Sequence, residues 1–140
     1  MNSFKVIVVD DQPLIANTLC QVLRSAGYST LAAYEAEGAM MLCRHHSPAL
    51  LLSDVIMPGI SGIELAQQVA RELPACRIIL FSGHVDTAPL MAAAREQGYH
   101  FECLAKPVQP ENLLARVHTI LEPEMQAETE PETEKDQKIA

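Results

Sequence analysis

The stretch Leu50-Leu51-Leu52-Ser53-Asp54 is a short apolar run that ends in a carboxylate, and three other stretches of the chain repeat this plan. Short apolar runs bounded by turn signals are typical of buried strands in a parallel sheet. Each run leads directly into a polar side chain. These stretches are residues 6–9 before Asp10 and Asp11, residues 78–81 before Ser82, and residues 103–105 before Lys106.

Helical patterns separate the apolar runs. Between Asp11 and Gly27 the apolar residues recur every three or four positions, with Pro13 in the first turn and Gly27 after the end. Strand and helix then alternate along the chain, which predicts an α/β fold with a doubly wound parallel sheet. The five predicted strands are the runs at residues 6–9 and 50–54 together with residues 28–33, 77–82 and 101–105, the last two of which contain the runs before Ser82 and Lys106. The remaining helices are residues 36–43, ending before His45, 62–73, 87–97 and 113–121.

The polar residues after the strands are expected to meet at one edge of the sheet. In an open parallel sheet, ligands bind outside the carboxyl ends of the strands. Three carboxylates in one crevice repel one another unless a cation lies between them. Magnesium prefers hard oxygen ligands, so the sequence predicts a divalent cation, best fitted by Mg²⁺, beside Asp10, Asp11 and Asp54.

The length and charge of the chain bound its organisation. We expect one domain at residues 1–121 of the 140, followed by an acidic and flexible tail at residues 122–140. The net charge of −8 argues against direct nucleic-acid binding, which needs clustered Lys and Arg. No apolar run approaches the length of a membrane span, which favours a soluble, cytoplasmic protein. The four widely spaced cysteines predict reduced thiols in the core.

Four motifs occur in order, each at the end of a predicted strand: Asp10-Asp11, Asp54 followed by Met57-Pro58-Gly59, Ser82-Gly83, and Lys106-Pro107. Together they resemble the CheY-like receiver domain of two-component response regulators, over about residues 4–121. The resemblance implies a flavodoxin-like, five-stranded sheet of order 2-1-3-4-5 with five helices. It also implies that Asp11, Asp54 and the backbone carbonyl of Ile56 contact Mg²⁺ directly, with Asp10 acting through water.

The same resemblance makes Asp54 the phosphoacceptor of a signalling protein that is not an enzyme. A carboxylate can attack phosphorus, and a metal ion with Lys106 can stabilise the charge on the transferred group. Ser82 and Lys106 are then the donors to the bound phosphoryl group. The implied function is a single-domain response regulator in a His-to-Asp phosphorelay. Its partners would be a sensor histidine kinase or phosphotransfer protein, and an output protein on the face of residues 87–97, 101–105 and 113–121.

The sequence departs from the family at Cys103. Receiver domains usually have Tyr or Phe three residues before the lysine, as a reporter of phosphorylation. Phe101 is two residues earlier, on the same face of the strand, and we expect Phe101 or a shifted backbone to replace that aromatic residue in part. Gly83 and His84 follow Ser82, and His84 is expected to tune the lifetime of the phosphorylated state.

Other interpretations remain open at this level. Asp11 could cap the following helix, Asp54 could be a solvent-facing strand end, and Ser82 a turn hydroxyl. Lys106 could be a snorkelling surface lysine. Two further functions compete: a receiver-like interaction scaffold that is not phosphorylated, and a hydrolase or phosphotransferase using Asp54. The second is disfavoured because Asp54-Val55-Ile56 offers no Asp-x-Asp pair. The lack of a glycine-rich phosphate loop argues separately against nucleotide binding.

Overall fold

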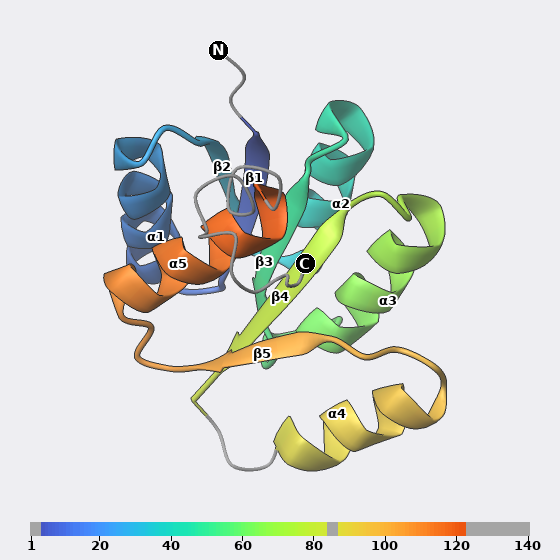
Figure 1. The fold of residues 1–140 in the computed structure, drawn as a ribbon. Helices are drawn as coiled ribbons and strands as arrows, with labels where there is room; N and C mark the ends of the chain where they lie inside the picture. Colours follow the sequence, from blue (N-terminus) through green and yellow to red (C-terminus); the bar gives the residue numbers. More distant parts are fainter. Residues whose placement is uncertain (1–3, 84–86, 123–140) are drawn as a thin grey trace, which may run out of the picture.

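The computed structural model describes residues 4–83 and 87–122, and it forms a doubly wound α/β sandwich (Figure 1). Five parallel strands pair in the order β2-β1-β3-β4-β5, as predicted. The strands are β1 (Lys5–Val9), β2 (Ser29–Ala33), β3 (Leu50–Asp54), β4 (Arg77–Ser82) and β5 (Glu102–Ala105), and the helices are α1 (Pro13–Ser25), α2 (Ala36–His46), α3 (Gly62–Glu72), α4 (Thr87–Glu96) and α5 (Pro110–Leu121).

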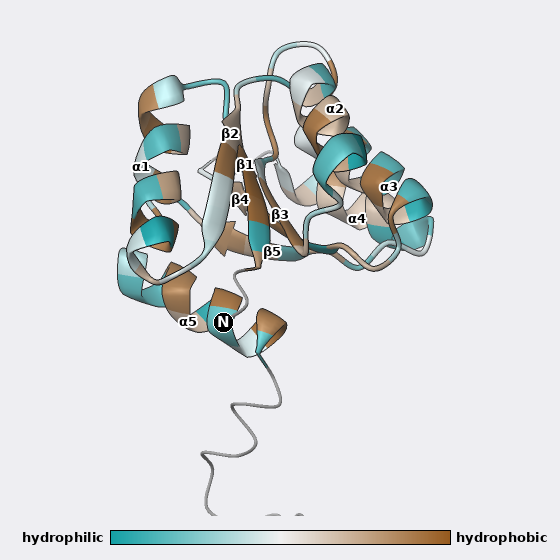
Figure 2. Cartoon of the chain, turned by 90° about the horizontal axis from the view of Figure 1, so that it is seen from above, coloured by the Kyte–Doolittle hydropathy of each residue, from teal (hydrophilic) through white to brown (hydrophobic). Residues whose placement is uncertain are grey.

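The helices cover both faces of the sheet. Helices α1 and α5 lie on one face and α2, α3 and α4 on the other, with the apolar strands between them (Figure 2). Side chains alternate along each strand, so Leu52 packs on the α1 and α5 side while Leu51 packs on the α2 and α3 side. All five residues of β3 are buried. The interior therefore consists of two apolar layers that hold β3 at the centre.

Several boundaries differ from the sequence prediction; α5, for example, begins at Pro110, three residues before Leu113. Helix α2 continues through His46, whereas it was expected to end before His45. The two histidines lie outside the core, in the last turn, where a positive charge is compatible with the helix dipole. The helix ends at Ser47, which has a φ of 47° and precedes Pro48, a residue that disfavours helical geometry before it. Strand β5 begins at Glu102, one residue after Phe101.

The cysteine prediction was right for three residues and wrong for Cys103. Cys20, Cys43 and Cys76 are buried free thiols, and burial raises the pKa of Cys43 to about 11 and that of Cys76 to about 12. Cys103 is exposed. It lies on β5, which is the last strand of the sheet and is covered less completely than the others.

Within the two described ranges, no helix combines the length and the apolar character that crossing a membrane requires.

Candidate functional site

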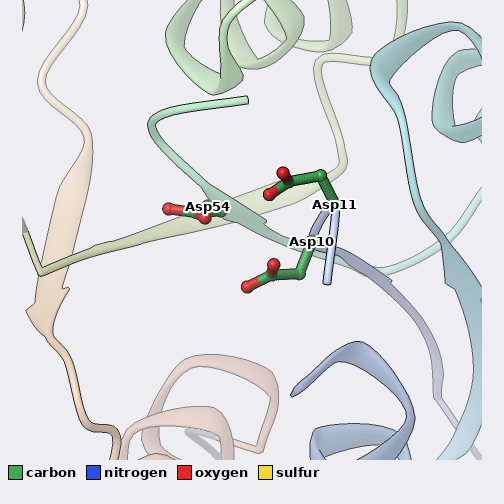
Figure 3. Close-up of side chains that lie close together, drawn as sticks. All are labelled: Asp10, Asp11 and Asp54. Atoms are coloured by element: carbon green, nitrogen blue, oxygen red, sulfur yellow. The ribbon is translucent and has the colours of Figure 1, made fainter. Parts of the chain in front are cut away.

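Three carboxylates gather at the carboxyl edge of the sheet (Figure 3). Asp10 and Asp11 directly follow β1, and Asp54 is the last residue of the neighbouring strand β3. One carboxylate oxygen from each lies within 4.8 Å of the others. Asp10 is fully buried and Asp54 is 4% exposed, so Asp54 is not a solvent-facing strand end. The parallel pairing of β1 with β3 therefore brings together the acidic cluster that the sequence predicted.

Lys106 joins this cluster from the other side. It follows β5, and its Nζ lies 3.0 Å from Asp10 Oδ2 and 3.1 Å from Asp54 Oδ2. The same ammonium lies 5.3 Å from the centre of the Phe81 ring. The lysine side chain is only 20% exposed, which excludes a snorkelling surface role. One cation thus bridges two buried carboxylates that come from different strands.

The alternative role of Asp11 as a helix cap is also excluded. Helix α1 begins after Gln12, and no side chain caps it. Instead, the backbone N–H of Gln12 donates to Asp10 Oδ1 at 2.9 Å. Asp11 is half-buried at the edge of the cluster, so its carboxylate is placed for the site.

The charges at the site shift two ionisation equilibria. Burial raises the pKa of Asp54 above its ordinary value, although the bond from Lys106 opposes this. Burial alone would lower the pKa of Lys106, but its bonds to Asp10 and Asp54 outweigh burial and raise it. The lysine is therefore a cation at neutral pH, held between two acceptors.

The donor set fits a divalent metal ion. Asp54 Oδ1 is buried and has no hydrogen-bond partner among the described residues. Leaving a buried carboxylate oxygen without a partner is costly, which favours a cation at that atom. Three close carboxylates are the oxygen-rich environment that Mg²⁺ prefers. These observations support a metal site made by Asp10, Asp11 and Asp54.

The loop after Asp54 folds back over the strand end. The N–H of Gly62 donates to the carbonyl of Val55 at 2.8 Å. A Cβ on Gly62 would lie 1.8 Å from the backbone oxygen of Asp54, so only glycine permits this approach. Ile56 lies in this loop and is 39% exposed. The part of its backbone carbonyl in metal binding stays a prediction.

Ser82 ends β4, the strand beside β3, and its main chain contacts Lys106. The register pairs Asp54 with Phe81 and Ser82 with Ala105. The N–H of Lys106 donates to the Ser82 carbonyl at 2.9 Å. Gly83 lies beside the same lysine, and a Cβ there would lie 3.3 Å from Lys106 Cβ. Ser82 is thus placed one residue beyond the level of Asp54.

The Ser82 hydroxyl has a partner that the sequence analysis missed. Its Oγ donates to Thr87 Oγ1 at 3.1 Å, and both side chains are buried. Thr87 is the first residue of α4. A hydroxyl residue at the start of a predicted helix was the available signal, but its pairing with Ser82 depends on where α4 packs.

Phe101, Cys103 and His84, the three other residues expected to affect the switch, lie in different surroundings. Phe101 stacks on Tyr99, with ring centres 5.6 Å apart, and packs against the cluster beneath α3 and α4. Cys103 pairs in register with Leu80 and is exposed. His84 lies outside the described residues. Whether Phe101 replaces the usual aromatic residue, and whether His84 tunes the site, both stay predictions.

An apolar hollow of about 310 Å³ lies beside Lys106. Its lining comes from the first turns of α1 and from the segment after β5. Leu14, at its border, is 79% exposed, which is unusual for a leucine next to a buried charged site. The residues that line the hollow are Leu14, Ile15, Thr18, Leu19, Phe81, Lys106, Pro107 and Val108.

Comparisons with known proteins agree with this geometry. The sequence model of the family described as "Response regulator receiver domain" matches residues 6–118. The nitrogen assimilation regulatory protein NtrX of Azorhizobium caulinodans is 29% identical over 84% of this chain and 26% of its own length. The DNA-binding response regulator MtrA of Mycolicibacterium smegmatis is 30% identical over 84% of this chain and 50% of its own length. The chain thus spans a quarter to a half of these relatives.

A solved structure has the same fold. The signal receiver domain of an HD domain-containing protein from Pseudomonas fluorescens superposes with a TM-score of 0.80 at 26% identity. The superposition covers 89% of this chain and 99% of that one. Nearly all of that chain is thus matched by the unit of five strands and five helices described above.

Proposed function

This chain belongs to the family of response regulator receiver domains, and we propose that it is a cytoplasmic phosphoacceptor switch in a His-to-Asp phosphorelay, with Asp54 as the phosphorylated residue. One observation supports this most strongly. Lys106 bridges Asp10 and Asp54, while Asp54 Oδ1 is buried without a partner among the described residues. A site made only for stability would pair that oxygen as well. The buried free thiols fit a reducing compartment.

The proposed reaction transfers one phosphoryl group from a phosphohistidine of a partner protein to Asp54. A carboxylate oxygen of Asp54 attacks phosphorus, and the new O–P bond forms as the N–P bond breaks. The electron pair of the broken bond stays on the imidazole nitrogen, which takes a proton from solvent. The partner histidine is then neutral, and Asp54 is an acyl phosphate.

Lys106 stabilises the charge of the group in transfer. Its ammonium lies against Asp54 before the reaction and can turn to the phosphoryl oxygens as they arrive. Asp10, Asp11, Asp54 and the Ile56 carbonyl would hold Mg²⁺. The bound ion would bring the formal charge of the three carboxylates and Lys106 to zero and offset the charge of the phosphoryl group.

The apolar hollow supports a protein as the donor. It lies between the start of α1 and the segment after β5, beside Lys106, and its border residue Leu14 is largely exposed. A sensor histidine kinase or phosphotransfer protein could cover this surface while it presents its phosphohistidine to Asp54. The output protein is proposed to bind the face of α4, β5 and α5, on which Cys103 is exposed.

The test is intact-protein mass after incubation with a small phosphodonor such as phosphoramidate. We expect an adduct of one phosphoryl group that requires Mg²⁺ and is absent in Asp54→Asn. The variant Asp11→Asn should need more Mg²⁺ for the same adduct. The exposed-residue variant Glu37→Gln, on α2, should behave like the parent.

The absence of an adduct contradicts the proposal when Mg²⁺ is shown to bind. Mg²⁺ binding can be followed separately, by the melting temperature with and without the ion. If the ion raises the melting temperature and no adduct forms, the phosphoacceptor proposal fails. The non-phosphorylated interaction scaffold would then be the better account, in line with the loss of the aromatic residue at Cys103.

A further inference from the structure

The hydroxyls of Ser82 and Thr87 form a link between the site and helix α4. Ser82 Oγ donates to Thr87 Oγ1 at 3.1 Å, where the two side chains are 9% and 7% exposed. Ser82 is the last residue of β4 and Thr87 the first of α4. The bond therefore joins the edge of the sheet, one residue beyond the level of Asp54, to the beginning of a helix.

The Ser82 hydroxyl can donate to only one acceptor at a time, so Thr87 and a phosphoryl group would compete for its proton. A serine hydroxyl has one proton to donate, and here the proton is directed at Thr87. A phosphoryl group on Asp54 brings only acceptor oxygens at neutral pH. Ser82 cannot direct its single proton at both acceptors. To bond the phosphoryl group, it has to turn away from Thr87.

We propose that Thr87 is a positioning residue that holds Ser82 in its resting orientation and competes with the phosphoryl group on Asp54 for the Ser82 proton. This inference rests on the proposed phosphorylation of Asp54. It assigns Thr87 a regulatory role at that site. The bond favours the unphosphorylated state, so its loss is part of the free-energy cost of switching.

The position of the start of α4 should report whether Ser82 has turned away from Thr87. The buried residues of α4 are Thr87, Met91 and Ala94. Met91 and Ala94 pack on the cluster that includes Leu80 and Val55, whereas Thr87 alone is linked to Ser82. When Ser82 turns to the phosphoryl group, α4 loses this contact at its first residue. We therefore expect phosphorylation to shift the first turn of the helix more than the part anchored by Met91 and Ala94.

The experiment is a titration of the protein and its variants with beryllium fluoride, a phosphoryl analogue, in the presence of Mg²⁺, followed by backbone amide NMR. Thr87→Val removes the hydroxyl and keeps a branched side chain. We expect it to raise the affinity about fivefold, the factor that corresponds to about 1 kcal/mol for one neutral hydrogen bond. Thr87→Ser keeps the hydroxyl and should bind like the parent. Equal or weaker binding by Thr87→Val would overturn the inference.

A double-mutant cycle separates this role from a general effect on α4. In the Ser82→Ala background there is no hydroxyl for Thr87 to hold, so Thr87→Val should change the affinity no further. If Thr87→Val still raises the affinity in the Ser82→Ala background, the effect arises from helix packing and the inference is wrong. If Thr87→Val does not fold, Thr87→Ala takes its place in the same double-mutant cycle.

The outcomes also distinguish the inference from the proposed function. Failure of the parent to bind beryllium fluoride and to form a phosphoryl adduct would contradict both. An adduct on the parent, with equal analogue affinity in the parent and Thr87→Val, would support the function and reject the role of Thr87. Proton exchange of α4 amides gives a second readout. In the parent, the first turn should exchange faster with the analogue bound, and in Thr87→Val it should change less.

Discussion

Strands β3 and β5 both lead into the site, but the protein holds them in different ways. Strand β3 lies between β1 and β4, and all of its residues are buried. Strand β5 is at the end of the sheet, and its residues alternate between half-buried and exposed. Asp54 is therefore positioned by the core. Lys106 is positioned by its own ion pairs and by its backbone bond to Ser82.

Polar contacts also hold α5, the helix that follows β5. Arg116 on α5 pairs with Glu102 on β5 through two hydrogen bonds. At the other end, the Tyr28 hydroxyl donates to Glu122 at 2.7 Å. Such contacts are weaker than core burial and depend on salt and pH. The half of the site near β5 can therefore adjust at less cost than the half near β3.

Truncation of one leucine in each strand tests the comparison most strongly. Leu52→Ala in β3 opens a cavity in the fully buried centre and should lower the free energy of unfolding by about 4 kcal/mol. Leu104→Ala in β5 removes a half-buried side chain and should cost about 1.5 kcal/mol. Urea unfolding of the two variants measures both values. Equal losses would show that β5 is held as firmly as β3.

Two glycines that pack against the residues at the ends of β3 and β5 give the second test. Gly62→Ala would put a Cβ 1.8 Å from the Asp54 backbone oxygen, which cannot move without shifting β3, so we expect a loss of about 3 kcal/mol. Gly83→Ala meets only the Cβ of Lys106 at 3.3 Å and should cost less than about 1 kcal/mol. Gly38→Ala, in α2 with nothing nearer than 3.7 Å, should be neutral or stabilising. A small effect at Gly62 would contradict the close approach.

The bond between Tyr28 and Glu122 is expected to contribute less, about 1.5 kcal/mol, as a buried hydroxyl bonded to a carboxylate. Tyr28→Phe should lose this amount near neutral pH. The exposed Tyr34, which bonds Asn17, provides the control, and Tyr34→Phe should change stability much less. Thermal or urea unfolding of the two variants at one pH makes the comparison.

The raised pKa of Tyr28 predicts how the stability of the protein depends on pH. Burial raises the pKa of Tyr28, and the bond to Glu122 raises it further, whereas tyrosine in the unfolded chain ionises near about 10. Above that pH the folded protein binds more protons than the unfolded one, so stability falls as pH rises. The difference between the parent and Tyr28→Phe should be constant up to about pH 9 and shrink above it. A constant difference at higher pH would argue against this cause.

The ion pair between Glu102 and Arg116 should have the smallest effect. Both side chains are partly exposed, so Arg116→Gln should cost about 0.5 kcal/mol. The loss should shrink at high salt, because screening weakens the pair in the parent. A double-mutant cycle with Glu102→Gln isolates the pair from other effects of the substitutions. A salt-independent loss would indicate that Arg116 acts by packing on β5.

Much of this organisation could be predicted from the chain alone. The apolar runs before Asp10, Asp54, Ser82 and Lys106 predicted the strands, because backbone groups in the core have to pair in a sheet. Parallel strands present their carboxyl ends at one edge, so the residues after them were expected to meet. The exposure of Cys103 was not predictable in this way. An apolar pattern does not say which strand will be the last in the sheet.

The sequence by itself determined which chemical groups meet at this edge, since strand periodicity and the residue after each strand are local properties. Only the tertiary structure decided how those groups pair. It set Lys106 between Asp10 and Asp54, left Asp54 Oδ1 without a partner among the described residues, and directed Ser82 to Thr87. Hydrogen bonds require atoms within about 3.2 Å of each other. Distances of that kind between separate strands and helices arise only from the packing of the whole sheet.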